Sequence, residues 1–413
     1  TTCGVNDVAP THASMNSTRK PASMTSTRDR VPLTAAHRLA LSAGVLFFAN
    51  GAVYGNWIPR LPEIKDRLGV GNSGLGVALL GGGIGGLVGS FAVGAIMSRI
   101  GSRRLVLAAL TFLAAAMTLV AFVSQAWMFL VVLSLVGLFD VCADVAINAQ
   151  GVIAQERLGR SVMNRLHGMW SLGFASGTVV GSLGAGLGVS LRLQVIAVAV
   201  LLIGAVWFVA RWLADADPSH HDESATASSS RQLGVIAIAL AVVGAAAIAL
   251  EGMPNEWGAL LMRDEFGIGE WAGFGTVAFG SGMLLGRFSG DYVQERIGSE
   301  RLFKLAMVLI VAGFGAVIAS SQPWLALCGL FVSGTGQAVI FPRLYLLAAR
   351  VPGLSAGTGL GALMVGLRLG GMSTTLSMGA LADAYDLRIA LASIAVVSFV
   401  LLLASNAVVT RRV

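Results

Sequence analysis

The sequence predicts an all-α membrane protein in which twelve transmembrane helices form two six-helix bundles. Three observations support this prediction: the composition, a series of long apolar segments, and a repeat that relates two halves of the chain. Of the 413 residues, 55% are hydrophobic and 12% are charged, and the mean hydropathy is +0.79. Because soluble domains carry about 25% charged residues, this composition excludes an ordinary soluble enzyme and a disordered chain.

Twelve apolar segments, each long enough to cross a bilayer, follow one another along the chain. One crossing needs about 20 predominantly apolar residues. The expected segments are 38–59, 73–97, 104–123, 127–150, 166–188, 193–213, 233–256, 271–292, 302–320, 324–347, 356–379 and 389–409.

Two polar stretches lie outside these segments. Residues 1–35 are rich in Ser, Thr and Ala, carry several basic side chains and lack the apolar core of a signal peptide, so we expect a disordered cytoplasmic tail. The acidic, Ser-rich interval 214–232 divides the segments six and six and is expected to be a cytoplasmic linker. Its two histidines are explained by a solvated linker better than by a metal site. The expected bundles then occupy residues 36–213 and 233–413.

The distribution of Lys and Arg predicts the orientation. If the N-terminus is inside, the inside segments hold 19 of the 28 basic residues and the outside loops hold six. Short cytoplasmic loops are enriched in Lys and Arg, so both termini are expected in the cytoplasm. The basic residues are scattered over many loops rather than gathered on one face, which argues against nucleic-acid binding.

Short motifs recur at offsets of 197 to 200 residues. Arg99-Ile-Gly101-Ser recurs as Arg296-Ile-Gly298-Ser, and further matches join Trp57 to Trp257 and Gly69 to Gly267. The matches stay in register across several loops and lie on the same side of the membrane, so they indicate a parallel repeat of two six-helix halves. Chance matching between apolar sequences is the alternative.

With these features the sequence resembles the major facilitator superfamily over about residues 38–410. The loop after the second segment reads Gly94-Ala-Ile-Met-Ser98-Arg99-Ile-Gly101-Ser-Arg103-Arg104, similar to the superfamily pattern G-x-x-x-D-R-x-G-R-R. Ser98 replaces the Asp of that pattern, whereas the second half keeps both Arg287 and Asp291. The resemblance implies a latch on the cytoplasmic face formed by Arg99, Arg103, Arg287 and Asp291, weakened in the first half.

Three further stretches are similar to the YbjJ-like bacterial inner-membrane permeases, which are related to the fucose–proton symporters. They are Asp144-Val-Ala-Ile-Asn-Ala-Gln150, His167 through Gly173, and Glu251-Gly-Met-Pro-Asn-Glu256-Trp257. This resemblance implies a multi-pass permease of the bacterial cytoplasmic membrane.

Acidic side chains inside apolar segments are the candidate proton carriers. A charge at the bilayer centre costs roughly 2.5–3.5 kcal/mol on insertion scales, so such residues face water, a partner or a substrate. Asp140, Asp144 and Asn148 share one face of the fourth segment because they are four residues apart. We expect Asp144, Asp140 or Glu251 to carry the proton; structural pairing with an Arg is the alternative.

Candidate substrate contacts come from several segments. Asn50, Tyr54 and Trp57 share a face of the first segment, and an amide, a phenol and an indole suit a polar ligand with an apolar surface. The remaining candidates are Asn148, Asn255, Gln337 and Arg368. Each has a structural alternative: the membrane-interface belt for Trp57, an interhelical hydrogen bond for Gln337, and a charge pair with Asp140 for Arg368.

Two more residues are expected at the inner gate. His167 begins the fifth segment, where a hydrogen bond with Asp144 or Asn148 is favoured over proton relay. Arg343 follows Pro342 near the inner end of the tenth segment.

The sequence lacks a Walker-type phosphate-binding loop and a nucleophile–base set, which argues against an ATP-driven pump and against an enzyme. We therefore expect a monomeric secondary transporter in the lipid bilayer that moves a small organic solute by alternating access, coupled to protons, without a metal or other cofactor. One alternative is a proton-coupled exporter of drugs or metabolites, although Thr178 stands where drug antiporters of the superfamily carry Pro. The other alternative is a non-transporting receptor or scaffold.

Overall fold

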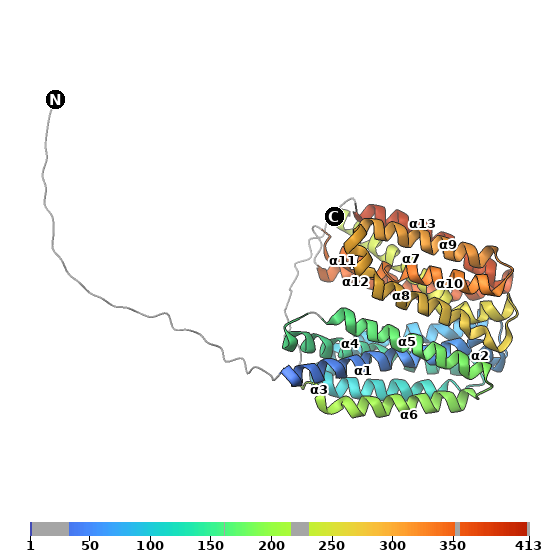
Figure 1. The fold of residues 1–413 in the computed structure, drawn as a ribbon, viewed down its shortest axis with the longest axis horizontal. Coiled ribbons are helices and arrows are strands. Elements are labelled where there is room, and N and C mark those ends of the chain that lie inside the picture. The colour runs from blue at the N-terminus through green and yellow to red at the C-terminus, as the bar shows by residue number, and fades with distance from the viewer. Residues whose placement is uncertain (2–32, 161, 216–230, 352–355, 411–413) are drawn as a thin grey trace.

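The computed structural model describes residue 1 and residues 33–160, 162–215, 231–351 and 356–410. Most of the expected N-terminal tail and most of the expected linker lie outside these residues; the last three residues of the expected tail, 33–35, already belong to a helix. The described residues form helices joined by short connections, in two groups that follow the two halves of the chain (Figure 1).

The first half contains five long helices and one short one. They are α1 (Leu33–Trp57), α2 (Leu61–Leu68), α3 (Asn72–Leu119), α4 (Ala126–Leu158), α5 (Met163–Gly186) and α6 (Leu191–Val209). The 3-10 helices η1 (Ile58–Arg60) and η2 (Ala210–Trp212) follow α1 and α6. The short helix α2 was not predicted, because it lies after the end of the first apolar segment.

The second half repeats this order with one helix broken in two. Its helices are α7 (Arg231–Asp264), α8 (Phe274–Ile297), α9 (Ser299–Ala319), α10 (Pro323–Gln337), α11 (Ile340–Ala349), α12 (Ala356–Ala384) and α13 (Leu387–Thr410). The 3-10 helix η3 (Gly269–Gly273) precedes α8. The predicted segment 324–347 is therefore two helices, α10 and α11, separated at Ala338 and Val339.

The described helices make the twelve predicted crossings. Among the described helices, eight are long and apolar enough to span a membrane by length and composition, if α10 and α11 are counted as one helix. These eight helices account for nine crossings. One of the eight, α3, is 48 residues long and consists of two helices that meet at Gly101. The other three crossings are α5, α8 and α12, whose glycines and polar side chains lower their hydropathy.

The backbone supports the sequence repeat. Gly101 has φ 79° and ψ 157° where the two crossings of α3 meet, and Gly298 has φ 83° and ψ 156° between α8 and α9. Residues other than glycine rarely adopt such positive φ values. The same backbone conformation therefore recurs at an offset of 197 residues, which confirms that the two turns are equivalent.

The bundle has two ends, which we call the terminal face and the far face. At the terminal face, on the left in Figure 1, α1 begins and α13 ends; α2 and η3 lie at the far face. The two halves are joined at the far face, where Arg263 of α7 pairs with Asp66 of α2 at 2.7 Å. Asp383 of α12 also accepts hydrogen bonds from the backbone N–H groups of Asn72 and Ser73, at 2.8 Å each.

The described part of the chain is closed at the far face. The hydrogen bonds and ion pairs that join described residues of one half to described residues of the other lie at that face or at the site described below. Within the first half, α1 packs tightly on α5, because a Cβ at Gly51 or Gly55 would lie 2.1 Å from the carbonyl oxygen of Trp170 or Phe174. This contact fixes the part of α5 that contributes to the site.

Candidate functional site

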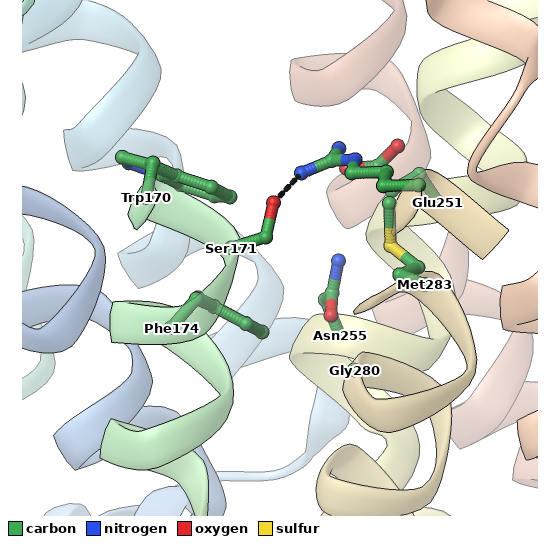
Figure 2. Close-up of a pocket in the computed structure, with 8 residues that line it drawn as sticks. Trp170, Ser171, Phe174, Glu251, Asn255, Gly280 and Met283 are labelled. Carbon is green, nitrogen blue, oxygen red and sulfur yellow. Dashed lines mark hydrogen bonds between the residues drawn. The ribbon is translucent and has the colours of Figure 1, made fainter. Parts of the chain in front are cut away.

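A pocket lies between the two halves, at the level where α5 faces α7 and α8. Figure 2 shows side chains of α5 on one side of it and side chains of α7 and α8 on the other. Its lining residues are Trp170, Ser171, Phe174, Glu251, Asn255, Gly280, Met283 and Arg287. Ligand sites favour such concave places, in which apolar walls surround a few polar groups.

Arg287 joins the two walls of this pocket. Its guanidinium donates a hydrogen bond to the hydroxyl oxygen of Ser171 and lies 5.8 Å from the centroid of the Trp170 ring. The family resemblance implied that Arg287 belongs to a latch on the cytoplasmic face, and its position along α8 corrects this. Arg287 lies ten residues before the end of α8 at Ile297, which places it about 15 Å deeper along a helix that rises about 1.5 Å per residue.

Two buried oxygen atoms at the pocket have no hydrogen-bond partner among the described residues. They are Oε2 of Glu251 and Oδ1 of Asn255, both on α7. Most buried polar groups in proteins are hydrogen-bonded to protein or to ordered water. These two acceptors are therefore available to a ligand or water that donates hydrogen bonds.

A chain of hydrogen bonds links an acid of α4 to the wall of the pocket. Asn50 of α1 donates its Nδ2 to Oδ1 of Asp140 at 3.0 Å, and the indole Nε1 of Trp170 donates to Oδ1 of Asn50 at 2.7 Å. The Trp170 ring stacks on Phe174 with centroids 5.6 Å apart. Tyr54 lies beside Asp140 and interacts with it. Asn50 and Tyr54, the substrate candidates of the first segment, therefore contact Asp140 of α4.

Asp144, Asn148 and His167 form a second group closer to the terminal face. Asn148 donates its Nδ2 to the backbone oxygen of Asp144 at 2.8 Å and to its Oδ1 at 3.1 Å. The His167 ring packs edge-on against Phe47, with centroids 5.1 Å apart, and lies within electrostatic reach of Asp144. Asp144 and His167 are both exposed, so this group is accessible to solvent in the present conformation.

Arg368 of α12 lies near both acids of α4 without forming an ion pair with either of them among the described residues. It is exposed and interacts electrostatically with Asp140 and Asp144. Its guanidinium lies against α3, because a Cβ at Gly86 would be 2.6 Å from its Nη1 atom. The charge pair with Asp140, the structural alternative for Arg368, is therefore not formed in this conformation.

Two candidate substrate residues are used elsewhere. Trp57 is 4% exposed and packs against Phe129, with ring centroids 6.0 Å apart, inside the first half. It lines neither the pocket nor the lipid interface. Gln337 is buried and donates its Nε2 to the carbonyl oxygen of Ala247 at 2.8 Å, so it joins α10 to α7. For Gln337 this is the interhelical hydrogen bond expected as the alternative to a ligand contact. Tight packing by neighbouring helices explains both positions.

One predicted latch residue, Arg103, and one predicted inner-gate residue, Arg343, form ion pairs within their own halves. Arg103 pairs with Asp215 at 2.8 Å, and Arg343 pairs with Glu300 at 3.0 Å. Arg99 is exposed near the Gly101 turn, and the side chain of Asp291 lies outside the described residues. The described residues therefore form no latch between the halves at this face, because the halves meet at the opposite one.

Several pocket residues were not predicted from the sequence. They are Trp170, Ser171, Phe174, Gly280 and Met283. Trp170 and Ser171 lie in the stretch from His167 to Gly173 that carries the permease resemblance, which was a usable signal. Phe174 and Met283 carried no such signal, because an apolar side chain in a membrane helix is most often a packing residue.

Known proteins resemble this chain in sequence and in structure. Membrane protein MosC of Rhizobium meliloti is 27% identical over 346 residues, which cover 81% of this chain and 83% of that protein. An uncharacterized MFS-type transporter of Yersinia pestis is 26% identical over 309 residues, covering 75% and 79%. Among solved structures, a variant of the nucleoside transporter NupG has a TM-score of 0.73 at 15% identity, with 90% of this chain and 99% of that chain covered.

A variant of the fucose:proton symporter FucP of E. coli shares the fold at a TM-score of 0.55 and 17% identity, with 91% and 98% covered. The sequence profile of the Major Facilitator Superfamily matches residues 43–372. The Yersinia pestis protein, NupG and FucP are named as transporters, not as enzymes. The chain belongs to the Major Facilitator Superfamily.

Proposed function

We propose that this membrane transport protein is a secondary active transporter that moves a small organic solute across a bacterial cytoplasmic membrane by alternating access, coupled to protons. The terminal face is the cytoplasmic face in this proposal, because the loops on that side carry most of the basic residues. The conformation closed at the far face is then open toward the cytoplasm.

The observation that carries the proposal is the pocket between the halves. Arg287 reaches from the second half to Ser171 of the first. Oε2 of Glu251 and Oδ1 of Asn255 line the same pocket and have no hydrogen-bond partner in the described part of the chain. Transporters built from two repeats bind their substrate at the interface between them, near mid-depth. A pocket with unpaired acceptors in that place fits a substrate site better than a packing defect.

The chemistry of the pocket favours a polar solute with a flat or apolar face. Glu251 and Asn255 present acceptors to hydroxyl or amine groups, and the stacked rings of Trp170 and Phe174 offer an aromatic wall. The similar structures of the nucleoside transporter NupG and the fucose:proton symporter FucP make nucleosides and sugars the first classes to test.

Proton coupling is assigned to the acids that face this region. Asp140 is linked to the pocket wall through Asn50 and Trp170, so a change in its charge acts on a residue that lines the pocket. Asp144 is exposed, which gives it access to solvent in this conformation. These two acids are the first candidates, and Glu251 in the pocket is the third.

A binding screen followed by transport in liposomes tests the proposal. Purified protein is heated with uridine, L-fucose, amino acids or drugs, since a ligand that binds the native state raises the apparent stability. The compound that stabilises the protein is then offered to liposomes with an acidic exterior. We expect uphill accumulation that a protonophore abolishes and that Asp140→Asn and Asp144→Asn, singly or together, reduce to passive exchange.

The exposed acid Glu270 of η3 offers a matched control, because Glu270→Gln removes a carboxylate that lies outside the pocket. Accumulation that survives both α4 substitutions contradicts coupling through that helix. Binding without movement across the membrane supports the receptor alternative, and stabilisation by drugs alone supports the exporter.

A further inference from the structure

Another acid of α7, Glu256, lies outside the pocket and has no role in the transport scheme above. Its side chain is partly buried between α7 and α12. It contacts the hydroxyl of Thr375 on α12, with Oε2 of Glu256 and Oγ1 of Thr375 2.8 Å apart. Thr375 is only 5% exposed, so water has little access to its hydroxyl.

The hydroxyl of Thr375 has two acceptors within reach and a single hydrogen. Its Oγ1 lies 2.8 Å from Oε2 of Glu256 and 3.0 Å from the carbonyl oxygen of Gly371, one turn earlier on α12. A threonine hydroxyl can donate one hydrogen bond and accept two. If Glu256 is ionised, one of these contacts contains no hydrogen. If Glu256 is protonated, its O–H donates to Thr375 Oγ1 and the Thr375 O–H donates to Gly371, so both contacts are hydrogen bonds.

No charged side chain compensates an ionised Glu256 within the described ranges. Glu251, five residues earlier on α7, belongs to the pocket, and Arg287 of α8 donates to Ser171. The charged groups of the other neighbouring elements have partners elsewhere: Arg60 with Glu63, Lys65 with Asp264, Asp66 with Arg263, Arg343 with Glu300, Arg388 with Glu265, and Asp383 with the start of α3. An unpaired charge away from water is costly, which also favours the neutral acid.

The pair lies beside a surface that must move during alternating access. A Cβ at Gly76 of α3 would lie 2.7 Å from the carbonyl oxygen of Thr375, so α3 and α12 touch there across the two halves. Two turns farther along α12, Asp383 accepts hydrogen bonds from the first turn of α3. Opening of the far face separates these helices and gives water a path to Thr375 and Glu256.

We propose that Glu256 is a further proton-carrying residue, which holds a proton while the far face is closed and releases it to water on that side when α3 and α12 separate. In this step the carboxyl O–H bond breaks, water accepts the proton, and the carboxylate becomes hydrated. Thr375 is its positioning residue. The inference rests on the proposed alternating access. It implies that the closed far face binds the proton more tightly, so raising the pH favours opening.

Spin-label distances across the far face test this without a known substrate. Ser124, in the connection before α4, and Tyr385, in the connection after α12, are exposed and belong to different halves. Both are changed to Cys in a chain whose Cys3, Cys142 and Cys328 are Ser, and the labelled protein is placed in lipid nanodiscs. We expect the long-distance population to grow with pH in this background and to stay small at every pH in Glu256→Gln.

Variants of Thr375 separate proton binding from a merely structural effect. Thr375→Ser keeps the hydroxyl and should keep the pH response, whereas Thr375→Val should weaken it. Glu270→Gln, at an exposed acid outside the pocket, is the matched acid control, and size-exclusion profiles and melting temperatures show which variants fold.

A pH response that persists in Glu256→Gln but disappears in Asp140→Asn overturns the assignment to Glu256 and leaves the proposed proton coupling intact. The assignment is also overturned if the spin-label distance distribution of the background protein does not change with pH. In that case proton-driven uptake in liposomes still tests the proposed function separately.

Discussion

Asp383 of α12 accepts a hydrogen bond from the backbone N–H of Ser73, so an acid of the second half caps the first turn of helix α3 in the first half. Its other carboxylate oxygen accepts from the N–H of Asn72. The first N–H groups of a helix have no partner within the helix and attract negative charge. The cap therefore holds the two halves together at the far face.

Removal of this cap should favour opening of the far face. An N-cap side chain contributes about 1 kcal/mol, so Asp383→Ala should raise the open-to-closed ratio about fivefold, because 1.4 kcal/mol corresponds to a factor of about ten. The spin-label pair at positions 124 and 385 measures the ratio. Asp383→Asn keeps an acceptor oxygen and should have a smaller effect. An unchanged distance distribution in Asp383→Ala would show that the cap does not contribute to closure.

The stabilisation of the closed far face by the Asp383 cap should be lost only at strongly acidic pH. Burial alone would raise the pKa of Asp383, but the hydrogen bonds from Ser73 and Asn72, together with the charge of Lys65, outweigh it and hold the pKa below the usual value of an aspartate. An acid whose pKa is depressed in the capped state stabilises that state fully above its ordinary pKa, about 3.9. The stabilisation is lost as the pH falls through the lowered pKa.

Asp383→Ala should accordingly raise the open-to-closed ratio by the same factor at pH 6 as at pH 8, so the slope of the response to pH stays unchanged. This separates the cap from Glu256, whose substitution should abolish the slope. A slope that vanishes in Asp383→Ala would assign the response to the cap instead.

Substitution of the unpaired acceptors should weaken ligand binding more than it weakens the fold. Glu251→Gln replaces one of the two carboxylate acceptors with an amide N–H donor, and Asn255→Ala removes the amide acceptor. Oε2 of Glu251 and Oδ1 of Asn255 have no hydrogen-bond partner among the described residues, so little intramolecular bonding is lost. A hydrogen bond between ligand and protein contributes about 0.5–1.5 kcal/mol, and more when a charged group is involved. We expect the dissociation constant of the compound found by thermal shift to rise about threefold to tenfold or more.

Ser171→Ala is the comparison variant for that measurement. It removes the hydroxyl that accepts from Arg287 and so breaks a contact between the halves. If Glu251→Gln and Asn255→Ala bind the compound as tightly as the unsubstituted protein does, the substrate site lies elsewhere.

Loss of the indole N–H of Trp170 should uncouple Asp140 from the pocket wall. Trp170→Phe keeps an aromatic ring against Phe174 but leaves Oδ1 of Asn50 without its donor. The loss of one hydrogen bond should cost about 1 kcal/mol of stability, and the pH dependence of uptake should flatten while binding of the compound at fixed pH is retained. Uptake measured across a pH series decides this. A pH profile that matches the unsubstituted protein contradicts the relay.

The sequence by itself determined the number and order of the crossings, the repeat and the faces of single helices, because all of these depend on local properties of the chain. Hydropathy over about 20 residues marks a crossing, and four-residue spacing placed Asp140, Asp144 and Asn148 on one face before any neighbour was known. The equivalence of Gly101 and Gly298 was also readable, because a short motif surrounds each of them.

Only the tertiary structure decided which side chains meet. Asn50 and Asp140 are 90 residues apart, and Arg287 and Ser171 are 116 apart, so no local spacing relates them. Trp57 shares a helical face with Asn50 but packs against Phe129, and Gln337 donates a hydrogen bond to a backbone carbonyl oxygen of α7. The spacing of residues along a helix determines which side chains point the same way. The helix packed against that face determines whether they contact a substrate, a proton path or another side chain.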